Sequence, residues 1–216
     1  MTFLEIIFSL GFYLFSLSSN VTIEHRVQGE TNPSFDFKTV PPPSKDDRGS
    51  HARVDLVVGR RDTNGADLSA LTDGKMPGGE DEPSANFFFA AGTDGGRIRM
   101  DLGEVVEIAQ VNTYSWHTGS RAPQVYNLYA SDGTDSNFNP SPDDKTHPAH
   151  VGWKLIAEVD TRPENGKKGG QYAVSITDPK GSLGKYRYLL FDVVPTEYDD
   201  PFGNTFFSEI DVIAKH

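Results

Sequence analysis

The sequence predicts an all-β protein, an antiparallel β-sandwich of the jelly-roll type. Short apolar stretches recur about every ten residues, which is the spacing of strands in such sandwiches. Turn signals such as Asp132-Gly133 and Asn165-Gly166 separate these stretches. The 21 glycines and 14 prolines also favour many turns, and no segment keeps a helical period.

The first strand is expected over residues 53–58, where apolar and polar residues alternate up to Gly59. The same reasoning predicts further strands over residues 86–90, 97–102, 105–116, 124–130, 153–159, 171–176, 186–194 and 206–213. A long loop over residues 62–84 precedes them, and another spans residues 134–152. Loops longer than about 15 residues are either functional or disordered, so the second loop is notable.

Composition excludes several classes of function. The formal net charge is −11 and the isoelectric point is near 4.9, so the surface repels phosphate backbones and anionic lipid. We therefore expect no nucleic-acid partner and no membrane insertion of the mature domain. The chain has no cysteine, which excludes disulfides, a thiolate nucleophile and a zinc-thiolate site.

The first 50 residues divide into two segments before the main domain. The apolar stretch over residues 6–17, followed by small residues, predicts a signal peptide over residues 1–18 and hence a secreted, cell-surface or periplasmic protein. Glu5 stands where such a peptide carries a positive charge, so an uncleaved anchor and a misplaced start codon are the alternatives. The prolines at 33 and 41–43 predict an irregular segment over residues 19–50, as a tether or a wrap around the domain. The β-sandwich domain is expected over residues 51–216.

Several motifs occur in an order that identifies a family resemblance. They are Leu71-Thr72-Asp73-Gly74, Arg97-Ile98-Arg99-Met100-Asp101-Leu102-Gly103, Tyr126-Asn127-Leu128-Tyr129-Ala130-Ser131-Asp132-Gly133 and Phe207-Ser208-Glu209-Ile210-Asp211-Val212. Their order resembles the galactose-binding-like, coagulation-factor C-type (discoidin-like) domain, which carbohydrate-binding modules of glycosidases also use. The resemblance covers roughly residues 52–214 and implies a scaffold that hosts many different ligands.

The resemblance implies a structural calcium ion where the Asp-Gly loop meets the glutamate of the last strand. Those positions correspond to Asp73 and Glu209. A hard cation binds carboxylate and loop carbonyl oxygens without a strict geometry, so the residue types are suitable. Lys75 and Met76 are not the usual residues of that loop, and Asp73 followed by glycine is also a plain turn signal.

A sugar-binding site is predicted from Trp116, His117 and Arg121, which follow one another where a strand meets a short loop. An indole ring can stack on the C–H face of a pyranose while His and Arg donate to its hydroxyls. Tyr198 and Phe202, in an acidic loop before the last strand, are expected to supply a second platform. The alternative is structural: Trp116 lies in the core, His117 caps a turn, and Arg121 pairs with a carboxylate.

Enzyme motifs are weaker. The two imidazoles of His147 and His150 lie in a proline-broken loop, and neither a His-Glu-x-x-His nor a Gly-x-Ser-x-Gly motif occurs. A jelly-roll polysaccharide lyase stays an alternative, because Tyr114, His117, Arg121 and Gln124 supply the residue types of a base and a neutraliser. A protein-binding adhesion or scaffold module is a further alternative. We expect a secreted, non-catalytic module that binds a glycan and holds a structural Ca²⁺.

Overall fold

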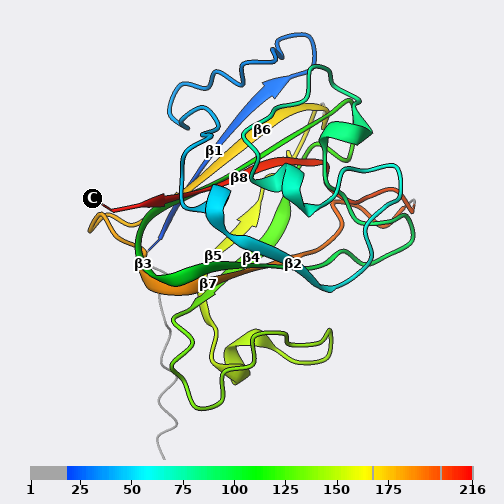
Figure 1. Ribbon diagram of the computed structural model, residues 1–216. Helices are drawn as coiled ribbons and strands as arrows, with labels where there is room; N and C mark the ends of the chain where they lie inside the picture. Colours follow the sequence, from blue (N-terminus) through cyan, green and yellow to red (C-terminus); the bar gives the residue numbers. More distant parts are fainter. Residues whose placement is uncertain (1–18, 167, 200, 216) are drawn as a thin grey trace, which may run out of the picture.

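The computed structural model describes residues 19–166, 168–199 and 201–215. Over these residues the protein is all-β, with eight strands that pair only antiparallel and four short 3₁₀ helices (Figure 1). The predicted antiparallel β-sandwich is therefore confirmed. The predicted signal peptide over residues 1–18 lies outside the described residues. In the part of the chain that is described, no helix is long and apolar enough to cross a membrane.

One layer of the sandwich contains β1 (Asn20–Val27), β6 (Gly170–Thr177), the second half of β3 (Gly96–His117) and β8 (Phe207–Ala214). The other layer contains the first half of β3 together with further strands. These are β2 (Arg53–Val58), β7 (Gly184–Val193), β4 (Val125–Ser131) and β5 (Lys154–Asp160). Side chains alternate between the two faces of each strand, so one face of each layer contributes to a common core. That core includes Ile98, Val111, Leu128, Val174, Phe191 and Ile210.

The long strand β3 passes from one layer to the other without a break. The sequence predicted two strands here, over 97–102 and 105–116, and that division is wrong. The pairing with β7 shifts register between Asp101 and Val106, and Gly103 has a φ of 81°. Glycine adopts this left-handed conformation at little cost, so the chain bends at this point and keeps its ladder.

Two further expectations need correction. Residues 86–90 do not form a regular strand, because they make only isolated bridges, Phe87 with Phe207 and Phe89 with Arg61. The phenylalanines of this segment are buried in the core, which explains the apolar pattern, but the segment does not pair as a strand. In the segment predicted to be irregular over residues 19–50, residues 20–27 form β1, which pairs with β6 along its whole length.

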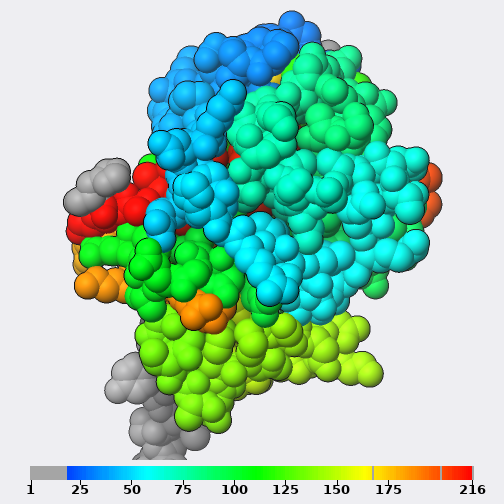
Figure 2. Space-filling view, viewed as in Figure 1, coloured from blue at the N-terminus to red at the C-terminus, as the bar shows by residue number. Residues whose placement is uncertain are grey.

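Both outer faces of the sandwich are covered by irregular chain. Residues 28–48, here called the N-terminal cover, lie on the layer that contains β1, β6 and β8. Figure 2 shows this cover in blue and light blue beside the red C-terminal strand. It ends at η1 (Gly49–His51), where the N–H of Arg48 donates to the carbonyl of Val212 at 2.9 Å.

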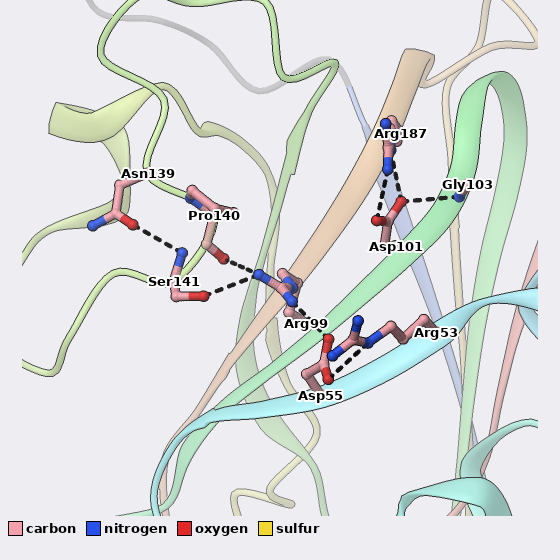
Figure 3. Close-up of polar contacts among 9 residues, drawn as sticks. All are labelled: Arg53, Asp55, Arg99, Asp101, Gly103, Asn139, Pro140, Ser141 and Arg187. Carbon is pink, nitrogen blue, oxygen red and sulfur yellow. Dashed lines mark hydrogen bonds and ion pairs between the residues drawn. The ribbon is translucent and has the colours of Figure 1, made fainter.

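Residues 132–153, here called the loop cover, lie on the outer face of the other layer and contain η4 (Pro148–Val151). They form the lime-green loop at the bottom of Figure 1. Arg99 on β3 donates to the carbonyl of Pro140 and to the hydroxyl of Ser141, each at 2.9 Å, and pairs with Asp55 at 2.6 Å (Figure 3). These contacts attach the predicted long loop to the sheet.

The remaining long connections gather at one end of the sandwich, here called the loop end. They are residues 59–95, 118–124, 161–169 and 194–206, which join strands whose termini are neighbours in the pairing. The first of them contains η2 (Leu68–Leu71) and η3 (Pro83–Ala85). The strands thus bring four of the predicted ligand-binding residues to the same end: His117, Arg121, Tyr198 and Phe202.

Candidate functional site

Arg121 is the centre of an aromatic stack at the loop end. Its guanidinium carbon lies 4.1 Å from the ring centroid of Phe206, 4.5 Å from that of Phe88 and 5.9 Å from that of Phe202. The rings of Phe88 and Phe206 stack on each other with centroids 4.0 Å apart. Arg121 Nε also donates to the carbonyl of Asn204 at 3.2 Å. Cation–π attraction and this hydrogen bond fix the guanidinium in place.

His117 ends β3 beside this stack, with its ring 4.6 Å from that of Phe206. Its Nδ1 accepts a hydrogen bond from the N–H of Gly119 at 3.0 Å. The ring hydrogen is therefore assigned to Nε2, which lies 3.9 Å from the carboxylate of the exposed Asp81. Burial, and then the nearby Arg121 charge, lower the pKa of His117, so the ring is neutral at pH 7 and offers an Nε2–H donor.

Tyr198 and Phe202 are the most exposed of the large apolar side chains in the described residues, at 67% and 53%. Both belong to the connection between β7 and β8. Tyr198 lines an open depression of about 320 Å³. The other lining residues are Gly92, Thr93, Asp94, Pro195, Glu197, Asp199, Pro201 and Gly203. Phe202 flanks it next to Arg121, so four of the five residues predicted to bind a ligand lie at this end.

Asn204 connects the depression to the arginine stack. Its side-chain amide donates to the carbonyl of Ala90 at 3.2 Å and to that of Thr93 at 3.4 Å, while its own carbonyl accepts from Arg121. The loop over residues 91–95 and the connection before β8 are thereby held together. Sequence reasoning missed Asn204, and its place after a glycine in a polar loop gave no signal of this role.

Trp116 does not take part in this site, and the prediction of an exposed indole is wrong. Its side chain is only 4% exposed and packs edge-on against Phe35, with ring centroids 5.5 Å apart. Consecutive strand residues face opposite sides, so Trp116 points to the outer face of its layer, where the N-terminal cover lies on it. His117, one residue later, reaches the loop end instead.

The four residue types weighed for a lyase are not assembled in one groove. Tyr114 is buried on the outer face, where its hydroxyl donates to the carbonyl of Pro41 at 2.7 Å. Gln124 is buried on the inner side, where its amide donates to the hydroxyl of Ser115 at 3.0 Å. Neither side chain faces the depression beside Tyr198. In the loop cover, His147 caps η4 by accepting from the N–H of Ala149.

The two residues predicted to bind calcium lie next to each other in space but differ in environment. Glu209 is fully buried; its Oε2 accepts from the N–H of Gly74 at 3.0 Å, and its Oε1 has no hydrogen-bond partner. Burial, together with the neighbouring charge of Asp211, raises the pKa of Glu209 to about 9. Asp73 is partly exposed and accepts from the N–H of Lys75 at 2.8 Å and from its ammonium at 3.3 Å. Glu209 therefore fits a cation ligand, whereas the carboxylate of Asp73 is occupied by Lys75.

Two buried carboxylates that the sequence reasoning did not single out lie close to Glu209. Asp211 follows Glu209 by two residues on β8 and is fully buried, and Asp47 is 9% exposed. Burial and then the charge of Asp47 raise the pKa of Asp211 to about 7. In the described parts of the chain, no group of three or more His, Asp or Glu side chains is arranged as a ready-made metal site. A cation in this region would need main-chain oxygens besides the carboxylates.

Comparison with known proteins finds only distant structural similarity. No protein-family model matches the sequence, and no curated protein matches it. Among solved structures, a fucose-binding module of Streptococcus pneumoniae has a TM-score of 0.48 at 10% identity, over 79% of this chain and 99% of that chain. A module of a family 31 glycoside hydrolase from Clostridium perfringens has a TM-score of 0.47 at 10% identity, over 78% and 98%.

A third solved structure is a family 32 module of Clostridium perfringens in complex with galactose. Its TM-score is 0.44 at 12% identity, over 76% of this chain and 95% of that chain. By their names, these three structures are carbohydrate-binding modules. Identities this low assign no ligand to the chain, so its site is argued from its own residues.

Proposed function

We propose that the chain is a non-catalytic module that binds a carbohydrate at the loop end. Tyr198 and Phe202 would form the contact platform, and His117 and Arg121 would stand beside it. The observation that carries this proposal is the pairing of two exposed aromatic side chains with an open depression of about 320 Å³. That volume lies at the lower end of the range for small-molecule sites, which suits one end of a glycan rather than a long chain.

The chemistry of the site favours a neutral ligand rich in hydroxyl groups. An exposed aromatic ring offers its face to the C–H groups of a sugar ring. Asp94 and Asp199 line the depression, and carboxylates accept hydrogen bonds from hydroxyl groups. The same carboxylates repel anionic sugars, in keeping with the net charge of −11. We therefore propose neutral glycans as ligands and acidic glycans as poor ones.

A glycan-array screen of the full chain tests this proposal, with Tyr198→Ala and Phe202→Ala as site variants. Val105→Ala is the matched control, because Val105 is 49% exposed and lies at the bend of β3, away from the loop end. We expect the parent and the control to bind the same neutral glycans and both site variants to lose that binding. Binding that survives in both site variants would remove the site from the proposal.

A protein-binding module is the second candidate, supported by one observation. Val194, Tyr198 and Phe202 are all exposed and all lie in the connection between β7 and β8. Exposed apolar residues gathered in one place are typical of protein contacts as well as of ligand sites. A parent protein that is folded but silent across the array would favour this candidate. Secretion of the chain stays a prediction in either case.

A further inference from the structure

Two carboxylates, Asp47 in the N-terminal cover and Asp211 in β8, form hydrogen bonds that join these two segments. Asp47 Oδ1 accepts from the N–H of Val212 at 2.9 Å, so the carboxylate of Asp47 points at β8. In return, Asp211 Oδ2 accepts from the N–H of Ser44 at 3.1 Å, so the carboxylate of Asp211 points at the cover. The two side chains therefore lie in one narrow contact, each directed toward the segment that carries the other.

Each of these carboxylates keeps one oxygen without a hydrogen-bond partner. Asp47 Oδ2 and Asp211 Oδ1 are both buried and unsatisfied, as is Glu209 Oε1 on the same face of β8. Asp211 and Glu209 are fully buried and Asp47 is 9% exposed. A buried polar atom without a partner costs about 1–3 kcal/mol, and more when the group is charged, so such atoms in a native fold point to a missing water or ion.

The positive charges nearby do not complete this contact. Arg48 follows Asp47 in the sequence but pairs with Glu104 at 2.7 Å. Among the described residues, none of the ion pairs involves Asp47, Glu209 or Asp211. His51 acts on Asp47 only through space. The three carboxylates therefore have no ion-pair partner among the described residues, although Asp211 Oδ2 also accepts from the hydroxyl of Tyr114 at 3.3 Å.

On its Asp47 side, the contact lies close to the surface of the molecule. A surface depression of about 230 Å³ lies beside it, lined by Asp46, Asp47, Arg48, His51, Ile213 and Ala214. Asp47 is the carboxylate of the pair that borders this depression. The carboxylates could instead be neutralised by protons. The calcium titration described below distinguishes protonation from binding of a metal ion.

We propose that a hard divalent cation, Ca²⁺, binds between the N-terminal cover and β8 with Asp47 and Asp211 as its carboxylate ligands. Main-chain and water oxygens would complete its shell, and Glu209 lies on the same face of β8. Calcium suits such a site because it takes six to eight oxygens in flexible geometry, whereas magnesium demands a near-ideal octahedron. This ligand set replaces Asp73, whose carboxylate is occupied by Lys75.

The proposal makes closure of the N-terminal cover dependent on calcium. The bound ion would join residues 44–47 to β8 and remove the repulsion between buried carboxylates. Under the same cover lie Tyr114 and Trp116, whose burial depends on Phe35 and Val40 staying in place. Loss of the ion would therefore loosen the cover without unfolding the sandwich.

Calcium titration of the full chain by calorimetry, with thermal unfolding in Ca²⁺ and in chelator, tests the proposal. For the parent we expect binding heat and a rise in melting temperature of about 5–10 °C at a calcium concentration of about 100 times Kd. Asp47→Asn and Asp211→Asn should lose both the heat and the rise. In chelator they should melt at or above the parent, because an amide removes a buried charge.

Two matched variants locate the site. Asp46→Asn alters the exposed neighbour of Asp47, and Asp73→Asn alters the ligand that the family resemblance implies; both should keep the calcium response. A parent without heat or temperature shift would overturn the proposal and leave protons as the neutralising partner. A response lost in Asp73→Asn and kept in Asp211→Asn would overturn it as well. Proteolysis within residues 28–43, expected to be faster in chelator, supplies a readout that does not depend on variant folding.

Discussion

Irregular chain covers both outer faces of the sandwich, but the buried charged groups under the two covers differ in whether the chain supplies their partners. Under the loop cover, Arg97 is 6% exposed and donates to both oxygens of Asp192, at 2.9 and 3.2 Å. It also donates to main-chain carbonyls of the cover, including that of Thr146 at 2.9 Å. Under the N-terminal cover, Asp47, Glu209 and Asp211 each keep an oxygen without a partner.

The buried charge of Arg97 is thus paired within the chain, whereas the carboxylates under the N-terminal cover form no ion pair among the described residues. A buried charge is tolerated when its partners are supplied in good geometry, as they are for Arg97. Each carboxylate under the N-terminal cover accepts hydrogen bonds on one oxygen only, and we propose that the partner of the other oxygen comes from solution. The loop cover should therefore close in any buffer, and the N-terminal cover should respond to the ions present.

The largest expected effect comes from removing the charge under the loop cover. Arg97→Met leaves the partly exposed Asp192 and the main-chain carbonyls of the cover without their donor, which we expect to cost about 3 kcal/mol of unfolding free energy. Chemical denaturation measures this loss, and it should be the same in calcium and in chelator. Arg53→Ala is the control, because Arg53 is 78% exposed and its pair with Asp55 should contribute less than about 1 kcal/mol. A loss of that small size for Arg97→Met would contradict the comparison.

Removing a carboxylate charge under the N-terminal cover should not lower the free energy of unfolding when calcium is absent. Asp211→Asn in chelator is expected to leave the free energy of unfolding unchanged or to raise it, because the amide needs no cation. The same substitution in calcium should be destabilising relative to the parent, since the parent alone gains the ion. Denaturation curves in the two buffers check this change of sign. A destabilisation of equal size in both buffers would mean that Asp211 is satisfied within the chain.

A second carboxylate, Glu24 on β1, holds residues 38–40 of the N-terminal cover and has all its partners within the chain. Its carboxylate accepts from the N–H groups of Lys38 at 2.8 Å and Val40 at 2.8 Å, and from both donors of Thr39. Burial alone would raise the pKa of Glu24, but these hydrogen bonds outweigh it and lower the pKa to about 2. The folded pKa lies below the ordinary value near 4.5, so this stabilisation is present above pH 4.5 and is lost as the pH falls toward 2.

Solvent screening reduces the contribution of this partly exposed carboxylate, so Glu24→Gln should cost about 1–2 kcal/mol at pH 7 and almost nothing near pH 2. Unfolding measured between pH 2 and pH 7 checks the convergence of the parent and the variant. A gap that stays constant over this range would show that the ionised carboxylate does not carry the contact.

Substitutions at the loop end are expected to have the smallest effect on the free energy of unfolding and the largest effect on glycan affinity. Tyr198→Ala and Phe202→Ala should change the free energy of unfolding by less than about 0.5 kcal/mol, because both side chains are exposed. Each should weaken glycan binding about tenfold, which corresponds to about 1.4 kcal/mol. Isothermal titration with a glycan chosen from the array measures both variants against Val105→Ala. Equal affinity in all three would separate the aromatic platform from the binding function.

The sequence predicted what depends on local pattern. Alternation identified residues 53–58 as a strand, and Asp-Gly turn signals marked the turns between strands. The bend of β3 was missed because Gly103 signals a break as readily as a continuous bend. His117, Arg121, Tyr198 and Phe202 were found because strand ends bring their loops together. Their exposure, however, is a property of packing and not of sequence pattern.

What the sequence could not predict depends on contacts between distant segments. Trp116 is buried because Phe35, more than eighty positions earlier, packs on it, and no local signal reports that contact. Asp211 could have been found, since it lies two residues after Glu209 and must share its face of the strand. Asp47 could not, because its contact with the backbone of Val212 spans 165 positions of chain.

Hydrogen exchange of the full chain, in calcium and in chelator, tests the difference between the two covers most directly. It reports local opening of each segment in the same sample. The account predicts that amides in residues 28–48 lose protection when calcium is removed, while those in residues 132–153 keep theirs. Protection that stays the same in both covers, or falls equally in both, would contradict the claim that the carboxylates under the N-terminal cover require an ion from solution.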